Sequence, residues 1–180
     1  MIINEQEIKQ EQVLEIGKRM LIAARTAPKG RGLDHLEAIL VTGDDIQTLA
    51  NFMEAGVPRH GRLFFVRDAA NIRVSQAVVV LATRQTVLNL NCGYCGYPSC
   101  VAKVEAGNEF PCVFPVIDLG IAIGSACSVA ADNRVDTRVM FSAGVAAMEL
   151  GWLGNDVTQA FAIPLSATSK SPFYDRAPVH

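Results

Sequence analysis

Four of the five cysteines in this 180-residue chain lie close together in the sequence. Cys92, Cys95, Cys100 and Cys112 fall within 21 residues, whereas Cys127 stands apart. Two residues separate the first two cysteines, four separate the second and third, and eleven precede the fourth. Thiolates are ligands of zinc and of iron–sulfur clusters, and clustered cysteines in a reducing compartment indicate a metal site and not disulfides.

The spacing favours an iron–sulfur cluster over zinc. Structural zinc sites usually combine two short C-x2-C pairs that lie well apart in the sequence, whereas here three cysteines occur within nine residues and one distant cysteine follows. Such a loop can wrap around three corners of a cubane while a separate segment supplies the fourth ligand. Gly93 and Gly96 each follow a cysteine, where a missing Cβ lets backbone N–H groups turn toward the sulfurs. Zinc stays open as an alternative, and a cluster here is as consistent with a stabilising role as with a redox role.

The other chemically active residue types form no recognisable constellation. Cys127 lies in the apolar sequence GSACSVAA, which is typical of core packing, so we expect it to be neither a ligand nor a nucleophile. The three histidines, His35, His60 and His180, are scattered. The sequence contains no P-loop, G-x-S-x-G or H-E-x-x-H motif, and it therefore assigns no catalytic residue.

The composition argues against several classes of partner. The chain is 50% hydrophobic and 19% charged, and its formal net charge is −2. Without a basic run to neutralise phosphates, we expect no nucleic-acid partner. The charge-free residues 85–102 contain proline, glycine and asparagine, and the apolar residues 119–131 are too few to cross a membrane and suit a core helix. The N-terminus lacks the apolar region of a signal peptide, so we expect a cytoplasmic protein with no membrane partner.

The elements before the cysteines alternate between helix and strand. Asn4 and Glu7 predict a capped helix over residues 5–27. A strand is predicted over residues 35–42, followed by a second helix from Asp44 to Gly56. The β-branched run at residues 76–82 predicts a strand buried on both faces. Residues 57–76 are weakly periodic and predict no element.

The elements after the cysteines complete a single domain. Residues 84–116 are too rich in glycine, proline and asparagine for a helix before Cys100. Beyond them we expect a helix from Asp118, another over residues 137–150, a strand over residues 157–165 and an irregular arm after it. Because no repeat or linker occurs, the chain is interpreted as one domain, residues 1–180, into which residues 84–116 are inserted.

The cysteine segment resembles a known motif. Its sequence, NCGYCGYPSCVAKVEAGNEFPC, is similar to the [4Fe-4S] motif C-x2-C-G-x3-C followed by a short helix and a fourth cysteine. That motif is found in corrinoid iron–sulfur proteins and in the B subunit of Rnf-type electron-transport complexes. The resemblance implies a [4Fe-4S] cluster on Cys92, Cys95, Cys100 and Cys112.

The rest of the chain resembles nitroreductase-type flavoproteins. MLIAARTAPKGRGLDHLEAILVTGDD is similar to their early part, and DLGIAIGSACSVAA, AAMELGWLGND and AIPLSATSKSPF are similar to their later part. The whole chain is similar to a family of uncharacterised prokaryotic proteins that contain a ferredoxin domain. These resemblances imply an α+β fold with a central sheet flanked by helices, FMN as a candidate cofactor, and a homodimer in which residues 118–131 form a packing face.

One departure from the nitroreductase pattern leaves two functions open. The Arg-x-Ser-x-Arg-like clamp for the flavin phosphate is replaced by MIINEQEIKQ. Arg25, Lys29 and Arg31 around the turn after the first helix, or Lys170 and Arg176 in the tail, could present their charges to a phosphate instead, or be solvated surface charges. One function is a flavin-dependent oxidoreductase that receives electrons through the cluster. The alternative is a ferredoxin-like electron carrier or cluster-bearing binding module without flavin, with a redox partner that the sequence does not identify.

Overall fold

The computed structural model describes residues 1–56, 61–107 and 110–174. Its elements in chain order are α1 (Glu5–Thr26), a 3-10 turn η1 (Gly30–Gly32), β1 (Leu36–Val41), α2 (Asp44–Ala55), α4 (Phe64–Arg73), β2 (Ala77–Arg84), α5 (Cys100–Glu105), α6 (Val113–Asp132), β3 (Asp136–Thr137), α7 (Phe141–Glu149) and β4 (Val157–Ser166). These strands form one antiparallel sheet in the order β1-β2-β4-β3.

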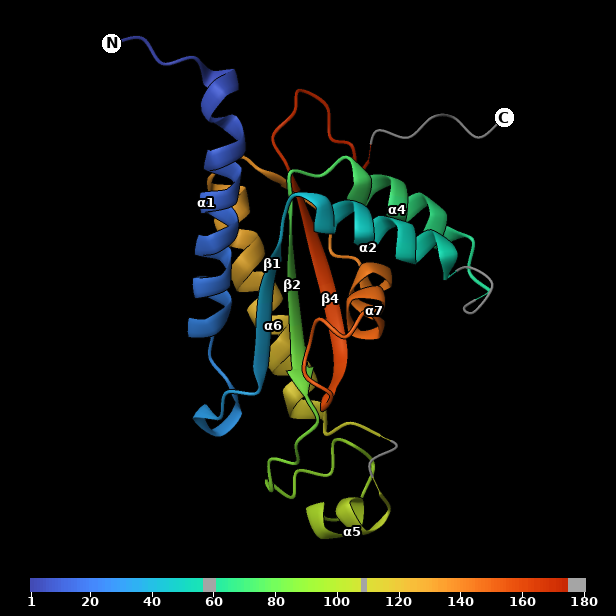
Figure 1. Cartoon of the computed structure of the whole chain (residues 1–180). Coiled ribbons are helices and arrows are strands. Elements are labelled where there is room, and N and C mark those ends of the chain that lie inside the picture. Colours follow the sequence, from blue (N-terminus) through green and yellow to red (C-terminus); the bar gives the residue numbers. More distant parts are fainter. Residues whose placement is uncertain (57–60, 108–109, 175–180) are drawn as a thin grey trace.

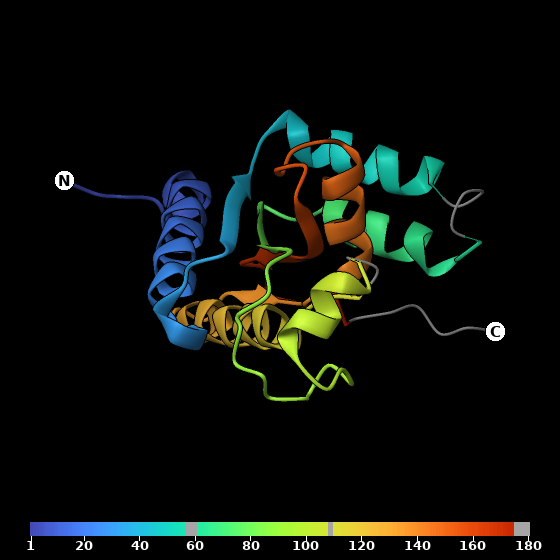
Figure 2. The ribbon, with the colours of Figure 1, turned by 90° about the horizontal axis from the view of Figure 1, so that it is seen from below.

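The sheet lies between two layers of helices (Figures 1 and 2). α1 and α6 pack on one face, and α2, α4 and α7 pack on the other. The side chains of β2 alternate between the two cores, Val78 and Val80 toward α2, α4 and α7, and Val79 and Leu81 toward α1 and α6. These four side chains have no exposed surface. The predicted burial of this strand on both faces is therefore confirmed, as is the mixed α+β class with a central sheet.

The most regular predicted elements agree closely with the structure. The first helix ends one residue earlier than predicted, and β1, β2 and β4 match the three predicted strands to within two residues at each end. The N-terminal cap forms as predicted, because the Asn4 side chain accepts a hydrogen bond of 3.0 Å from the backbone N–H of Gln6.

One helix that the sequence does not predict, and the starts of two others, differ from the sequence predictions. α4 occupies part of residues 57–76, where its apolar stripe of Phe65 and Ile72 is interrupted by the buried Asp68 carboxylate, which accepts a 2.7 Å hydrogen bond from Ser142. α6 begins five residues before Asp118, because the proline in its first turn needs no N–H there. α7 begins later than residue 137, because the preceding residues pair with the end of β4 and form β3.

α6 is the one helix in the described part of the chain that is long and apolar enough to cross a membrane. Only 33% of its most apolar stretch is buried. Ala122 and Ala126 face α1 and the sheet, whereas the side chains of Ile117 and Ile121 are 43% and 42% exposed. One face of α6 thus belongs to the core, and the other presents apolar side chains outward.

Candidate metal centre

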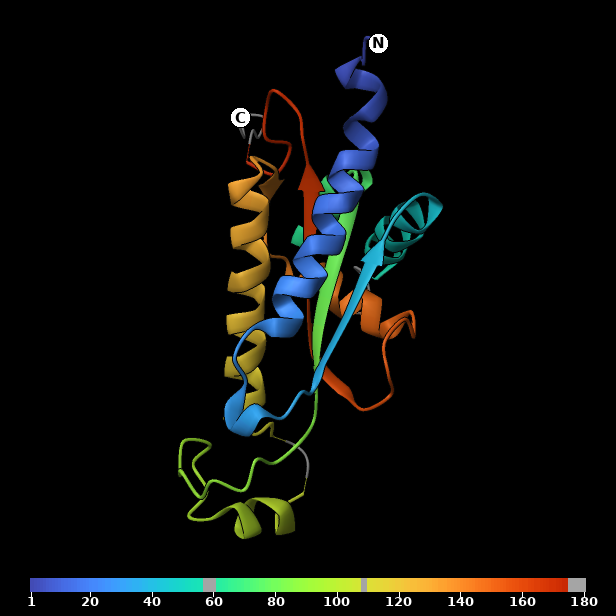
Figure 3. The same ribbon diagram turned by 90° about the vertical axis from the view of Figure 1, so that its left-hand side faces the viewer.

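The cysteine segment projects from one end of the sheet (Figures 1 and 3). It leaves the end of β2 and returns to the body at the start of α6. α5 is the regular element in the part of it that the structure describes. The segment therefore contributes four thiols from a loop that neither hydrophobic core includes.

Asn91 joins the start of the loop to Cys100. The backbone N–H of Asn91 donates to Cys100 Sγ at 3.3 Å, and the backbone N–H of Cys100 donates to Asn91 Oδ1 at 2.8 Å. These reciprocal bonds bring Cys92, the next residue after Asn91, close to Cys100. A backbone N–H directed at sulfur also stabilises negative charge on it.

A tight turn separates Cys92 from the rest of the loop. The Gly96 N–H donates to the Gly93 carbonyl at 2.9 Å. Gly93 and Gly96 have φ angles of +74° and +83°, which residues with a Cβ adopt only with strain. Cys95 lies inside this turn, and Cys92 directly precedes it.

An aromatic pair links this turn to the fourth cysteine. The ring of Tyr94 stacks on Phe114, with centroids 6.2 Å apart and planes inclined by 12°. Phe114 lies two residues after Cys112, which is buried and forms the N-cap position of α6. A thiolate at this position benefits from the positive end of the helix dipole. The stack therefore holds the Cys92 to Cys95 turn beside the start of α6.

The four thiols are unpaired but are not gathered around one point. All of them are free, and three are partly exposed. Among the described residues, no three His, Cys, Asp or Glu side chains lie close enough together to hold a metal ion. The structure thus brings the four cysteines into one loop, while the assignment of Cys92, Cys95, Cys100 and Cys112 as ligands stays a prediction.

A buried lysine shows that an anionic group fits this loop. The side chain of Lys103 in α5 is 1% exposed, and its Nζ has no hydrogen-bond partner. A buried ammonium without a partner is strongly unfavourable, because it loses its hydration without compensation. Thiolate-ligated iron–sulfur clusters are anionic, so the donor set and the unpaired cation together suit such a group.

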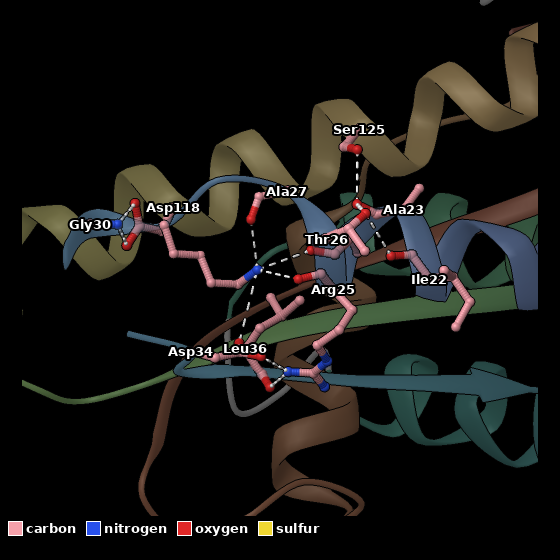
Figure 4. A network of polar contacts seen from close by, with 12 residues as sticks. Ile22, Ala23, Arg25, Thr26, Ala27, Gly30, Asp34, Leu36, Asp118 and Ser125 are labelled. Carbon is pink, nitrogen blue, oxygen red and sulfur yellow. Dashed lines mark hydrogen bonds and ion pairs between the residues drawn. The ribbon is translucent and has the colours of Figure 1, made fainter. Parts of the chain in front are cut away.

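The cations proposed for a flavin phosphate are engaged within the chain. The Lys29 ammonium donates to the carbonyls of Ala24, Arg25 and Ala27 at 3.3, 2.7 and 2.9 Å, and so caps the end of α1. Arg25 donates to the Asp34 carboxylate at 2.7 Å and to the Leu36 carbonyl at 2.8 Å (Figure 4). Both side chains therefore fix the turn between α1 and β1.

The same turn also holds the cysteine segment at both of its ends. Arg31 donates to the Leu88 carbonyl at 2.7 Å, near the start of the segment. The Gly30 N–H donates to both carboxylate oxygens of Asp118 at 3.0 and 3.1 Å, near its end (Figure 4). A Cβ at Gly30 would lie 2.6 Å from the end of the Leu88 side chain, so this side chain would have to move to admit a larger residue. The turn is thus a clamp on the loop that carries the cysteines.

Lys170 lies at the opposite end of the sheet. In the antiparallel register, Thr83 at one end of β2 pairs with Leu36, and Ala77 at the other end pairs with Leu165. The turn with the other three cations precedes Leu36, whereas Lys170 follows Leu165. At about 3.4 Å per residue, the two ends of β2 are roughly 24 Å apart. The structure therefore brings Arg25, Lys29 and Arg31 together without Lys170, and Arg176 lies outside the described residues.

Cys127 is far from the other cysteines. It is half-buried in α6, and burial raises the pKa of its thiol, opposed by a hydrogen bond with the Thr137 side chain. Fifteen residues of helix separate it from Cys112, which corresponds to about 22 Å. This placement agrees with the expectation of a packing role.

Three residues of the candidate site could not be predicted from the sequence. Lys103, Asn91 and Asp118 carry no motif, and Asp118 resembles an ordinary helix cap in the sequence. Of the three, only Asp118 has a feature in the sequence that indicates a special role. It is the single charged residue within the otherwise apolar stretch 113–131. Its carboxylate is 8% exposed and lies inside α6, where a charge requires a specific partner.

Comparisons with known proteins agree with these observations. Residues 109–176 match the family described as "Uncharacterized protein containing a ferredoxin domain". This range includes Cys112 but none of the three earlier ligand candidates. An uncharacterized protein of Archaeoglobus fulgidus is 40% identical over 185 residues, which cover 99% of each chain.

Solved structures with a similar fold are nitroreductases and related oxidoreductases. A nitroreductase family protein from Clostridium novyi NT has a TM-score of 0.57 at 14% identity, over 92% of this chain and 75% of that one. An oxidoreductase containing FMN has a TM-score of 0.59 at 12% identity, over 87% and 67%. A Desulfovibrio desulfuricans protein in complex with FMN has a TM-score of 0.58 at 13% identity, over 92% and 80%. The predicted nitroreductase-like fold is thereby confirmed.

Proposed function

Because the chain belongs to the family of uncharacterized proteins that contain a ferredoxin domain, we propose that it is an iron–sulfur redox protein. Cys92, Cys95, Cys100 and Cys112 are the proposed ligands of a [4Fe-4S] cluster. The observation that carries this proposal is the presence of four free thiols and a buried, unpaired lysine in one loop. When bound, such a cluster carries one electron at a time.

The chain's own residues have separate tasks in this proposal. The Asn91 N–H stabilises charge on Cys100 Sγ, and the N-terminus of α6 does so for Cys112. Arg31 and Gly30 hold the two ends of the loop against the body. The loop stands at one end of the molecule (Figure 3), where a redox partner has access to it.

A flavin-dependent oxidoreductase is the second candidate function. It is favoured by the shared fold with proteins that contain FMN. Against it, Arg25, Lys29 and Arg31 already have partners within the chain. The groove between α1 and residues 133–135 measures about 190 Å³, whereas ligand pockets are usually about 300–1,000 Å³. This groove is therefore too small for a flavin within one subunit, and we propose that a second subunit would complete a flavin site.

A homodimer through α6 is part of the proposal. Ile117 and Ile121 are exposed on the outer face of this helix, and a Cβ added at Gly120 or Gly124 would meet nothing within 4 Å. A second copy packed on this face would remove the exposed isoleucines from water, and the small residues would allow close approach.

A visible absorption spectrum of anaerobically purified protein tests the proposal. We expect broad brown absorbance that bleaches on addition of dithionite, with no yellow flavin released on denaturation. Stoichiometric release of FMN would favour the second candidate. A colourless protein that contains one zinc per chain would contradict both.

A further inference from the structure

α5 buries its lysine and exposes its valines. Lys103 is the one residue of α5 that is buried, whereas the side chains of Val101 and Val104 are 65% and 56% exposed. A helix on a protein surface normally has the reverse arrangement, because apolar side chains gain from burial and charged ones lose their hydration. The orientation of α5 thus needs an attraction that acts on the ammonium group.

No described residue supplies that attraction. Lys103 Nζ is among the buried polar atoms without a hydrogen-bond partner, and no ion pair within the described ranges includes it. Lys29 is similarly buried, with its side chain 7% exposed, but its ammonium group donates hydrogen bonds to three carbonyls. The burial of Lys103 therefore calls for an anion that is not a side chain of the described residues.

Lys103 lies close in the chain to a proposed ligand. It lies three residues after Cys100, and residues with this spacing share one face of a helix. Cys100 is bonded to Asn91, which precedes Cys92. Lys103 is therefore within one helical turn of a proposed ligand that is itself hydrogen-bonded to the residue before Cys92.

We infer that Lys103 is the counter-charge of the [4Fe-4S] group and raises its reduction potential; this inference rests on the proposed function. Reduction adds one electron, and so one negative charge, to a cluster that is already anionic. A fixed and buried cation near the cluster favours the more negative state. Lys103 is a positioning and tuning residue in this account, since it is not a ligand.

The test is a redox titration of the purified holoprotein with dithionite as the reductant, followed by its absorbance. Lys103→Met removes the charge and keeps most of the apolar stem, and Lys103→Arg keeps the charge. Lys18→Met is the matched control, because the Lys18 side chain is 62% exposed in α1. We expect Lys103→Met to weaken reduction at least tenfold, a potential lower by about 59 mV or more for a one-electron couple. Lys103→Arg and Lys18→Met should stay within threefold of the unmodified protein.

The outcomes separate this inference from the proposed function. Loss of iron from Lys103→Met alone, with retention in Lys103→Arg, would also support a counter-charge. An unchanged potential in Lys103→Met, or loss of the cluster from both Lys103 variants, would overturn the inference and leave the cluster proposal standing. An unmodified protein that holds no iron–sulfur cluster would instead contradict the proposed function itself.

Discussion

Cys112 and Cys127 lie on the same helix in different chemical settings. Cys112 is buried at the N-cap position of α6, beside the positive end of the helix dipole. Cys127 lies about 22 Å further along, where burial raises the pKa of its thiol and so keeps it protonated and unreactive. The same residue type therefore has a proposed ligand role at one site and a packing role at the other.

Serine substitution distinguishes these two roles. Cys95→Ser should abolish most of the visible absorbance of the holoprotein, because a hydroxyl is a much weaker ligand for iron than a thiolate. Cys127→Ser is the control and should retain the absorbance, with a loss of stability of about 1 kcal/mol from burying a hydroxyl. Absorbance spectra at equal protein concentration provide the comparison, and an equal loss of colour from both variants would show that the ligands are misassigned.

The cysteines of the candidate site could be predicted from the sequence, but the residues around them could not. A ligand set is visible in residue types and spacing alone. The role of Lys103 depends on which face of α5 is buried, and the pattern of Val101 and Val104 predicts the opposite face. Asn91 contacts Cys100 through its backbone N–H and its side-chain oxygen. Neither contact follows from a regular spacing in the sequence.

Close contact between α7 and β4 fixes the position of that helix. Gly144 faces the strand, and a Cβ placed on it would lie 2.0 Å from the carbonyl oxygen of Ala160. Because the obstructing atoms belong to the backbone, a larger residue would force the helix away from the sheet. Gly17 in α1 is also buried, but its Cβ would meet only the ends of two side chains, Leu40 at 2.8 Å and Leu165 at 3.3 Å.

Gly144→Ala should lower the free energy of unfolding by about 3 kcal/mol, the upper part of the usual range for overpacking. Gly17→Ala should cost less, because the Leu40 side chain can rotate away and alanine favours the helix. Urea denaturation followed by circular dichroism measures both changes. An equal or smaller effect at Gly144 would contradict the proposed contact between α7 and β4.

The elements that were not predicted correctly depend on contacts between residues that are distant in the sequence. β2 could be predicted from the sequence because its apolar run is continuous and both of its faces are buried. α4 could not be predicted in this way, because its buried face contains the charged Asp68. That carboxylate pairs with the adjacent Arg67 and with Arg138, and it accepts a hydrogen bond from Ser142, and the last two residues are distant in the sequence. The start of α7 depends on the pairing between β3 and β4, and this pairing cannot be predicted from the residues near the start of α7.

The described part of the molecule contains two hydrophobic cores, a peripheral cysteine loop and an apolar outer face on α6. The cores on the two sides of the sheet contain no residue of the loop. The exposed isoleucines belong to α6, and this helix lies in the same layer as α1 (Figure 3). An apolar face of this kind on a folded domain is typical of an interface.

Light scattering after size-exclusion chromatography tests the proposed homodimer. We expect a mass of about 39 kDa, twice the 19.4 kDa of one chain. Ile121→Lys places a charge in the interface and should yield the monomer, whereas Val74→Lys, at a 58% exposed position next to α4, should not. A monomeric unmodified protein, or a dimer that survives Ile121→Lys, would contradict this arrangement.

The most direct test of the account is the content of iron and acid-labile sulfide in anaerobically purified protein. Four iron atoms and four sulfides per chain, lost together in Cys95→Ser, are the predicted result. One zinc per chain without sulfide, or full iron content in Cys95→Ser, would contradict the assignment of the cysteine loop as a [4Fe-4S] site.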